Sequence, residues 1–332
     1  MRVRRKALKR REMHTMTQQQ RRLRATRGTL AAILALIALT GRPGAAQELT
    51  GRFETIDVPG AIQTVVRGIT ADGRLVGHYI TAPGVVHGFL LAGGTLTTID
   101  APFAEALANR TSAQGINARG DVVGVWQRPG PVPRGYLLEA YGGFSKIEVP
   151  GAVQTRPRSI NASGEIVGWF GALGLMHGFI RDRAGEYRSF DIPGATHTHA
   201  HSINDRGDIV GVYFIGPAVP LNTIDAFATT TGASHGFLLT ADGYTMLDVP
   251  FPGGLNTGAF GINAAGDIVG CYFAASNRGL TFVRDRHGEY RSFEAPGASF
   301  TCGVAINAGG DIAGNYADAN GATHGFVLYQ PK

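Results

Sequence analysis

The chain has 332 residues, with 31 Lys or Arg, 25 Asp or Glu and 10 His, and a formal net charge of +6. Twelve of the basic residues and one acidic residue lie in residues 1–46, so residues 47–332 hold 19 basic and 24 acidic residues. Without an excess of basic residues, this larger part lacks the electrostatic footprint of a nucleic-acid-binding protein.

The first 46 residues predict a signal peptide. A basic region that ends at Arg27 is followed by the apolar run Thr29–Thr40 and by "GRPGAA", with cleavage expected after Ala46. The apolar run is shorter than the roughly 20 residues that span a bilayer. An uncleaved N-terminal anchor is the alternative. We therefore expect an exported protein, periplasmic, cell-surface or extracellular, with no transmembrane span in the mature chain.

Residues 47–332 contain six copies of one unit, and such repeats determine the choice of fold. Each copy has an acidic-x-Pro step, a core that ends in glycine, and a stretch such as "HGFLL". The cores are "GITADGRLVG" (68–77), "GINARGDVVG" (115–124), "SINASGEIVG" (159–168), "SINDRGDIVG" (202–211), "GINAAGDIVG" (261–270) and "AINAGGDIAG" (305–314).

Each unit predicts four short strands, which we call a to d. Strand a ends at the acidic-x-Pro step, strand b leads into Ile-Asn, strand c contains the last core glycine, and strand d is the "HGFLL" stretch. Asn-x-x-Gly between strands b and c is turn chemistry. Six units of four strands predict an all-β, six-bladed β-propeller with four-stranded antiparallel blades. The units cover approximately 52–94, 95–143, 144–187, 188–243, 244–290 and 291–332.

The core followed by "HGFLL" resembles the HAF-type repeat of bacterial extracellular proteins. In that family the usual triplet is His-Ala-Phe, whereas this chain has Gly in the middle and replaces the His by Arg134 and Leu280 in two units. The resemblance covers nearly all of residues 52–330. It implies export and a propeller-like fold, and it assigns no catalytic residue.

The N-terminal strand Arg52–Val58 predicts how the ring closes. Strands b, c and d of one unit are expected to form a sheet with strand a of the next, which leaves the last unit without a fourth strand. Arg52–Val58 would supply that strand, so that no sheet edge remains unpaired.

Differences between the copies predict a binding face. Length varies only in the a–b and c–d connections, most of all at Ile215–Ser234, and these connections emerge at one end of the fold. In strand b every unit has a threonine, which indicates a scaffold position, while its neighbours point to the other side and vary. The predicted ligand-binding residues are six that we expect to ring the channel mouth, Gln63, Arg110, Gln154, His197, Asn256 and Phe300, and two that we expect just deeper, Arg156 and His199.

His197, His199 and His201 raise the question of a metal site, because His-x-His on a strand places two imidazoles on one face. No carboxylate or cysteine ligand is fixed beside them by the sequence. We favour histidines that face solvent or a ligand, with no cofactor, and keep a metal ion as the alternative.

Cys271 and Cys302 are the two cysteines, and they fall in strand c of the fifth unit and strand b of the sixth. Neighbouring units place these strands near one another, so a disulfide between them is a further prediction.

Two classes of function follow, beside a third in which the chain is a structural or adhesive repeat protein with no small ligand. The first is an exported, non-catalytic binding scaffold, expected to be a monomer, whose polar ring contacts a glycan, a peptide or a surface polymer. The alternative is a propeller enzyme, a lyase or hydrolase, with a metal- or histidine-assisted site at the channel mouth. No catalytic residue is assigned from the sequence.

Overall fold

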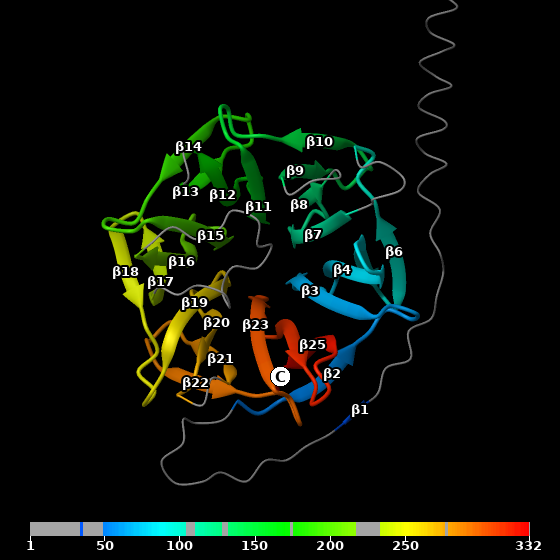
Figure 1. Ribbon diagram of the computed structural model, residues 1–332, viewed down its shortest axis with the longest axis vertical. Helices are drawn as coiled ribbons and strands as arrows, with labels where there is room; N and C mark the ends of the chain where they lie inside the picture. The colour runs from blue at the N-terminus through cyan, green and yellow to red at the C-terminus, as the bar shows by residue number, and fades with distance from the viewer. Residues whose placement is uncertain are drawn as a thin grey trace, which may run out of the picture.

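The computed structural model describes residues 34–35, 49–103, 110–127, 132–172, 175–216, 233–275 and 278–331. Every regular element in these ranges is a β-strand, and no helix occurs within them. Accordingly, the described ranges offer no helix that is long and apolar enough to cross a membrane. Figure 1 shows the strands arranged around a common centre.

Three sheets contain the strands. The first consists of β3 (Gln63–Ile69), β4 (Leu75–Ala82), β5 (Val85–Ala92), β6 (Thr95–Ile99), β7 (Arg110–Ile116), β8 (Val122–Gln127), β9 (Pro133–Leu138) and β10 (Phe144–Ile147). The second consists of β11 (Gln154–Ile160), β12 (Ile166–Ala172), β13 (Leu175–Arg181), β14 (Tyr187–Phe190), β15 (His197–Ile203), β16 (Ile209–Ile215), β17 (Ala233–Thr240) and β18 (Gly243–Leu247). The third consists of β1 (Leu34–Ala35), β2 (Arg52–Ile56), β19 (Leu255–Ile262), β20 (Ile268–Phe273), β21 (Gly279–Arg284), β22 (Tyr290–Phe293), β23 (Phe300–Ile306), β24 (Ile312–Ala317) and β25 (Thr323–Tyr329).

Each sheet contains two groups of four successively antiparallel strands, which are joined by a single parallel residue pair. In the first sheet, for example, β3 to β6 form one group and β7 to β10 the other, and the pair Val86–Arg110 links them. The strands β3, β7, β11, β15, β19 and β23 lie nearest the centre in Figure 1, and we call them the inner strands.

The N-terminal strand belongs to the last group. β2 pairs antiparallel with β25, with Arg52 opposite Tyr329 and Ile56 opposite Gly325. The pairing predicted for Arg52–Val58 is therefore confirmed over β2. Within the predicted leader only β1 is described, and it pairs with β2; the rest of the leader lies outside the described residues.

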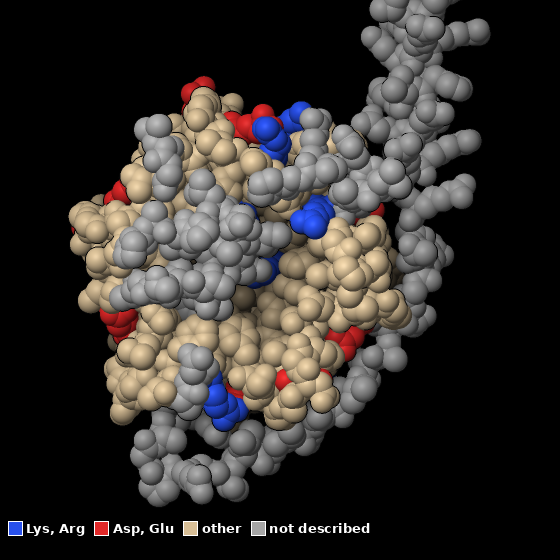
Figure 2. Space-filling model, in the orientation of Figure 1, with Lys and Arg blue, Asp and Glu red and all other residues tan. Residues whose placement is uncertain are grey.

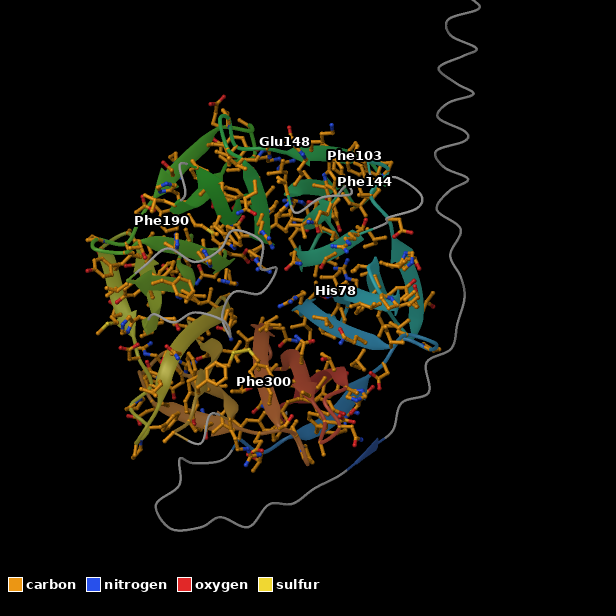
Figure 3. The ribbon with its side chains drawn as sticks, viewed as in Figure 1. His78, Phe103, Phe144, Glu148, Phe190 and Phe300 are labelled. Carbon is orange, nitrogen blue, oxygen red and sulfur yellow. A yellow bond between two sulfur atoms is a disulfide. The ribbon has the colours of Figure 1, made fainter. Side chains whose placement is uncertain are left out.

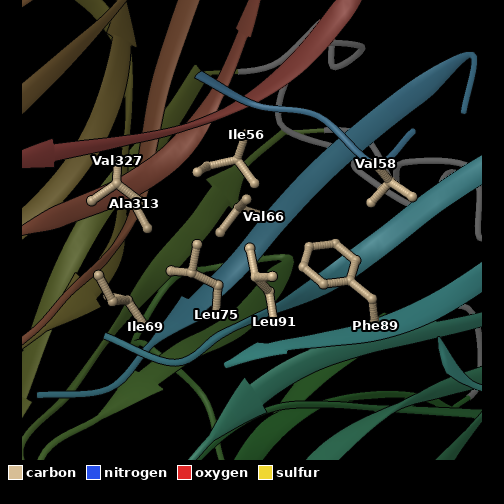
Figure 4. Packing of buried hydrophobic residues seen from close by; sticks show 9 residues of the cluster. All are labelled: Ile56, Val58, Val66, Ile69, Leu75, Phe89, Leu91, Ala313 and Val327. Atoms are coloured by element: carbon tan, nitrogen blue, oxygen red, sulfur yellow. The ribbon is translucent and has the colours of Figure 1, made fainter. Parts of the chain in front are cut away.

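The hydrophobic core is divided into clusters that lie between neighbouring groups. Figure 4 shows one, in which Ile56, Ala313 and Val327 from the last group pack against Val66 and Phe89 from the first. Burying a large apolar side chain contributes roughly 1.5–3 kcal/mol to the free energy of folding. This packing therefore stabilises the contact between the last group of strands and the first.

The threonine present in every unit fastens strand a to the inner strand. Its Oγ accepts a hydrogen bond of 2.9–3.3 Å from the backbone N–H that follows the acidic residue of the acidic-x-Pro step, as Thr64 does from Val58. The six threonines are Thr64, Thr111, Thr155, Thr198, Thr257 and Thr301. Their scaffold role is confirmed.

In five of the six core turns an asparagine connects one group to the next. Its Nδ2 donates to the carbonyl oxygen of the equivalent residue in the following group, at 3.2–3.3 Å, from Asn117 to Asn161 and onward to Asn307. Asn307 then donates to the carbonyl of Thr70 in the first group, at 3.2 Å. The sequence indicated only a turn at these positions.

The repeated histidine of strand d pairs with the acidic residue of the acidic-x-Pro step. His87 lies 3.0 Å from Asp100, and three other histidines pair in the same way with Asp191, Asp248 and Asp57. In the two units without the histidine, Arg134 pairs with Glu148 and Arg278 with Glu294. These histidines are therefore structural.

A β-bulge interrupts each inner strand at the same repeat position, and the extra residue has no partner on strand c. Beside the bulge the strands approach so closely that a Cβ on Gly168 would lie 2.1 Å from the carbonyl oxygen of Arg156, which explains the glycine in every unit. Bulges redirect side chains, often next to functional sites. The six bulge residues are Arg67, Gln114, Arg158, His201, Phe260 and Val304.

Candidate functional site

The inner strands surround a cavity of about 480 Å³, which we call the central cavity. Its lining comes from all six inner strands and from the second strand of most groups. In Figure 3, His78 and Phe300 lie near the centre of the view, whereas Phe190 and Glu148 lie at the periphery. Ligand pockets commonly have volumes of about 300–1,000 Å³, so this space suits a small ligand.

The bulge residues form the floor of the central cavity. All six line a smaller cavity of about 140 Å³ that continues toward the core turns, and all except Gln114 also line the central cavity. The bulges thus turn a variable side chain from every inner strand toward the same region.

Five of the eight predicted binding residues line the central cavity, namely Gln63, Arg110, Arg156, His199 and Phe300. They come from five of the six inner strands and converge on one space, with Arg110 exposed and Arg156 buried. The largest predicted insertion, Ile215–Ser234, lies mostly outside the described residues.

The other three predicted residues do not line the central cavity. Each forms a hydrogen bond with a nearby residue of the fold. His197 is buried, and its Nδ1 accepts the backbone N–H of Met176 at 3.1 Å. Asn256 Oδ1 accepts the N–H of Ser234 at 3.2 Å. Gln154 is buried, with its Oε1 3.4 Å from Arg156 Nε.

The sequence analysis missed the contribution of strand c. The residue after its glycine lines the cavity as His78, Val125, Trp169, Val212 and Asn315, and the sixth such residue is Cys271. A signal was present, because this position holds five different residue types in six copies beside an unchanging glycine.

Arg156, Trp169 and His199 stack against one another. The guanidinium carbon of Arg156 lies 4.7 Å from the centre of a Trp169 ring, and the His199 ring stacks on Trp169 at 4.4 Å with 12° between the planes. A guanidinium over an indole is held by cation–π attraction. His199 Nε2 also lies 3.3 Å from Met176 Sδ.

A chain of polar side chains crosses three groups. Arg158 Nη1 donates to Gln114 Oε1 at 2.6 Å, Gln114 Nε2 donates to Ser112 Oγ at 2.7 Å, and Ser112 Oγ lies 2.8 Å from His78 Nδ1. Since Ser112 accepts from Gln114, its own hydroxyl is able to donate to His78. All four side chains are buried.

Two histidines of the cavity, His199 and His201, have lowered pKa values. Burial lowers the pKa of His199 and of His201 well below the usual 6.5, and the nearby Arg158 charge lowers both pKa values further. Arg156 adds to the effect on the pKa of His199, and Arg67 to that on His201. The positive charges therefore act together on one region.

The possible metal site consists of His197, His199 and His201, whose ring-to-ring distances the structure gives. The ring centres of His197 and His199, and those of His199 and His201, are 6.4 Å apart. Among the described residues no group of three His, Cys, Asp or Glu side chains is arranged to hold a metal ion.

Cys271 on β20 and Cys302 on β23 form a disulfide, with an S–S distance of 2.03 Å and a Cα–Cα distance of 5.1 Å. The predicted disulfide is thus confirmed. It joins neighbouring groups beside the central cavity, whose lining includes Cys302.

Several solved structures have a fold similar to that of this chain. The chain is similar to the gluconolactonase XC5397 of Xanthomonas campestris, at 14% identity over 92% of this chain and 99% of that chain, with a TM-score of 0.51. It is similar to a triple mutant of AofleA from Arthrobotrys oligospora, at 10% identity over 86% and 89% of the chains, with a TM-score of 0.52. A third similar structure is the β-propeller domain of the Trilobed protease from Pyrococcus furiosus, at 9% identity over 80% and 95%, with a TM-score of 0.46.

No family model matches the sequence, and no curated protein matches it. At such low identities the structural likeness shows the fold alone, which is that of an all-β propeller.

Proposed function

We propose that the protein is an exported, non-catalytic binding scaffold whose ligand occupies the central cavity. In this proposal the six four-stranded groups are the blades of a closed six-bladed propeller, with β2 as the closing strand. The pairing of β2 with β25 and the bond from Asn307 to Thr70 support the closure.

One observation carries the proposal. The residues that repeat in all or most units, such as Thr155 and Asn161, bond to backbone and hold the fold. The cavity is lined instead by positions that differ from unit to unit, such as Arg110, Arg156 and Phe300. Ligand specificity usually comes from side chains that surround one concave space and that the fold itself does not require.

Export and membership of the HAF-type repeat family are part of the same proposal. The basic and apolar segments of residues 1–46 support a signal peptide. A disulfide between Cys271 and Cys302 is consistent with an oxidising compartment, because disulfides persist mainly in exported proteins.

The proposal is tested by screening the purified protein against glycan and peptide arrays and then measuring affinity for any hit. Arg110→Ala and Phe300→Ala should each weaken binding about tenfold or more, because both side chains line the cavity. Tyr244→Ala, on the exposed outer strand β18, is the matched control and should change nothing. A ligand whose affinity is indifferent to both cavity variants would show that it binds elsewhere.

A second candidate function rests on Ser112 and His78. A serine hydroxyl 2.8 Å from a histidine nitrogen, in a cavity with arginines, is the arrangement of a nucleophile and its base. The protein would then be a hydrolase. Labelling of Ser112 by a fluorophosphonate, lost in Ser112→Ala and in His78→Gln, would support this function; an unlabelled wild-type protein would count against it.

A further inference from the structure

The central cavity has a charge opposite to that of residues 47–332 as a whole. Its described lining contains Arg67, Arg110, Arg156 and Arg158 and no Asp or Glu, although residues 47–332 hold more acidic than basic residues. Figure 2 shows basic side chains within the central hollow and on its rim. A concave site with one sign of charge concentrates ligands of the other sign.

Two of the arginines are buried and held in fixed positions. Arg156 has 1% of its surface exposed and stacks on Trp169 at 4.7 Å. Arg158 has 8% exposed and donates to Gln114 at 2.6 Å. Neither an indole face nor an amide oxygen adds a negative charge, so these contacts orient the guanidinium groups and leave their charge in place. A planar, oriented guanidinium matches carboxylate and phosphate oxygens.

The cavity also holds a polar group without a bond and an apolar wall. The indole Nε1 of Trp169 is buried and has no hydrogen-bond partner in the described structure. Buried donors are normally bonded, so an acceptor from a ligand or from water is expected near it. Val212, Phe214, Phe260 and Phe300 line the same space and would contact an apolar or ring-shaped body.

We propose that the ligand of the central cavity is an organic anion, with a carboxylate or phosphate group at the arginines and an apolar or ring-shaped body against the phenylalanines. This rests on the proposed function and names its ligand class. Burial is the main cause of the lowered pKa values of His199 and His201, and the additional lowering by the charges of Arg158, Arg156 and Arg67 agrees with a positive potential at the floor of the cavity.

Three small probes with one shared body test the proposal. They are 2-naphthoate, 2-naphthyl phosphate and the neutral 2-naphthamide, each titrated into the purified protein by calorimetry. At least one anion should bind about tenfold or more tightly than the amide, because charge-assisted hydrogen bonds are stronger than neutral ones. The preference should shrink with added NaCl. Comparison of the two anions decides whether the site takes a carboxylate or a phosphate.

Matched variants locate the effect. Arg67→Gln should weaken anion binding about tenfold and leave amide binding unchanged. Arg156→Lys keeps the charge and should weaken the anion less, through loss of the planar group. Arg188→Gln, which removes an exposed arginine on β14, is the control and should have no effect. Near-ultraviolet circular dichroism shows whether each variant is folded.

Two results would overturn the inference. One is equal affinity for the amide and both anions, or anion affinity that Arg67→Gln and Arg156→Lys leave unchanged. The other is no binding of any of the three probes. In either case the proposed function is judged separately, because an uncharged hit from the arrays whose binding is lost in Phe300→Ala would leave a binding scaffold with a neutral ligand.

Discussion

Asn161→Ala is expected to destabilise the fold by about 2–4 kcal/mol. Asn161 is 3% exposed; its Nδ2 donates to Asn204 carbonyl oxygen at 3.3 Å and to the Glu165 carboxylate at 2.9 Å, and its Oδ1 accepts the Glu165 N–H at 2.9 Å. A hydrogen bond contributes about 1 kcal/mol, more when one partner is charged, and an orphaned buried group costs about 1–3 kcal/mol. Alanine removes all three bonds and leaves the Glu165 N–H without its acceptor.

The chain itself supplies the matched variant for this experiment. The first unit has Thr70 in place of the asparagine, and its Oγ accepts the Arg74 N–H at 3.0 Å. Asn161→Thr should therefore keep the bond that it accepts from the Glu165 N–H and lose the two bonds that Nδ2 donates, to the Glu165 carboxylate and to the next group, at a cost of about 1–2 kcal/mol. Urea unfolding measures both variants, with the m-value as a check on the unfolded state. If Asn161→Thr equals wild type, the bond between groups contributes nothing, and the reasoning is refuted.

Three further predictions concern other parts of the molecule. Thr70→Asn should add the bond that the first group lacks and raise the free energy of unfolding by about 1 kcal/mol in the same urea assay; no gain would mean that the turn cannot reach its neighbour. The double substitution Cys271→Ala with Cys302→Ala should lower the free energy of unfolding by about 3–4 kcal/mol, because the disulfide closes a loop with a sequence separation of 31, and an unchanged urea midpoint would contradict this. Because the unfolded state takes up protons at His199 and His201 near pH 6.5 and the folded state does not, stability should fall as the pH drops below about 6.5, with up to about 1.4 kcal/mol per pH unit from each imidazole. Substitution of both by Gln should flatten this slope in urea titrations at several pH values, and an unaltered slope would assign the effect to other groups.

The repeat by itself determined the four-stranded units and the role of the residues that recur in them. The fold makes the same demands on each copy. A comparison of the six copies therefore distinguishes the residue positions that the fold requires from those that are free to vary. This is why the threonines, the pairing of Arg52–Val58 and the proximity of Cys271 and Cys302 could be predicted. The sequence also held a signal for the His–Asp and Arg–Glu pairs that our sequence analysis did not use, because the acid is Glu148 or Glu294 where the preceding strand d lacks the histidine.

Only the tertiary structure decided which variable residues reach the centre. In a regular strand successive side chains alternate between two faces, which is what the sequence predicts for β11 and β15. A bulge at Arg158 and at His201 shifts this alternation in the rest of each strand. No local sequence pattern indicated these bulges. Burial was equally out of reach, because it depends on what the neighbouring group contributes. His197 lies against the backbone of Met176, and Trp169 lines the cavity from strand c, one residue after Gly168.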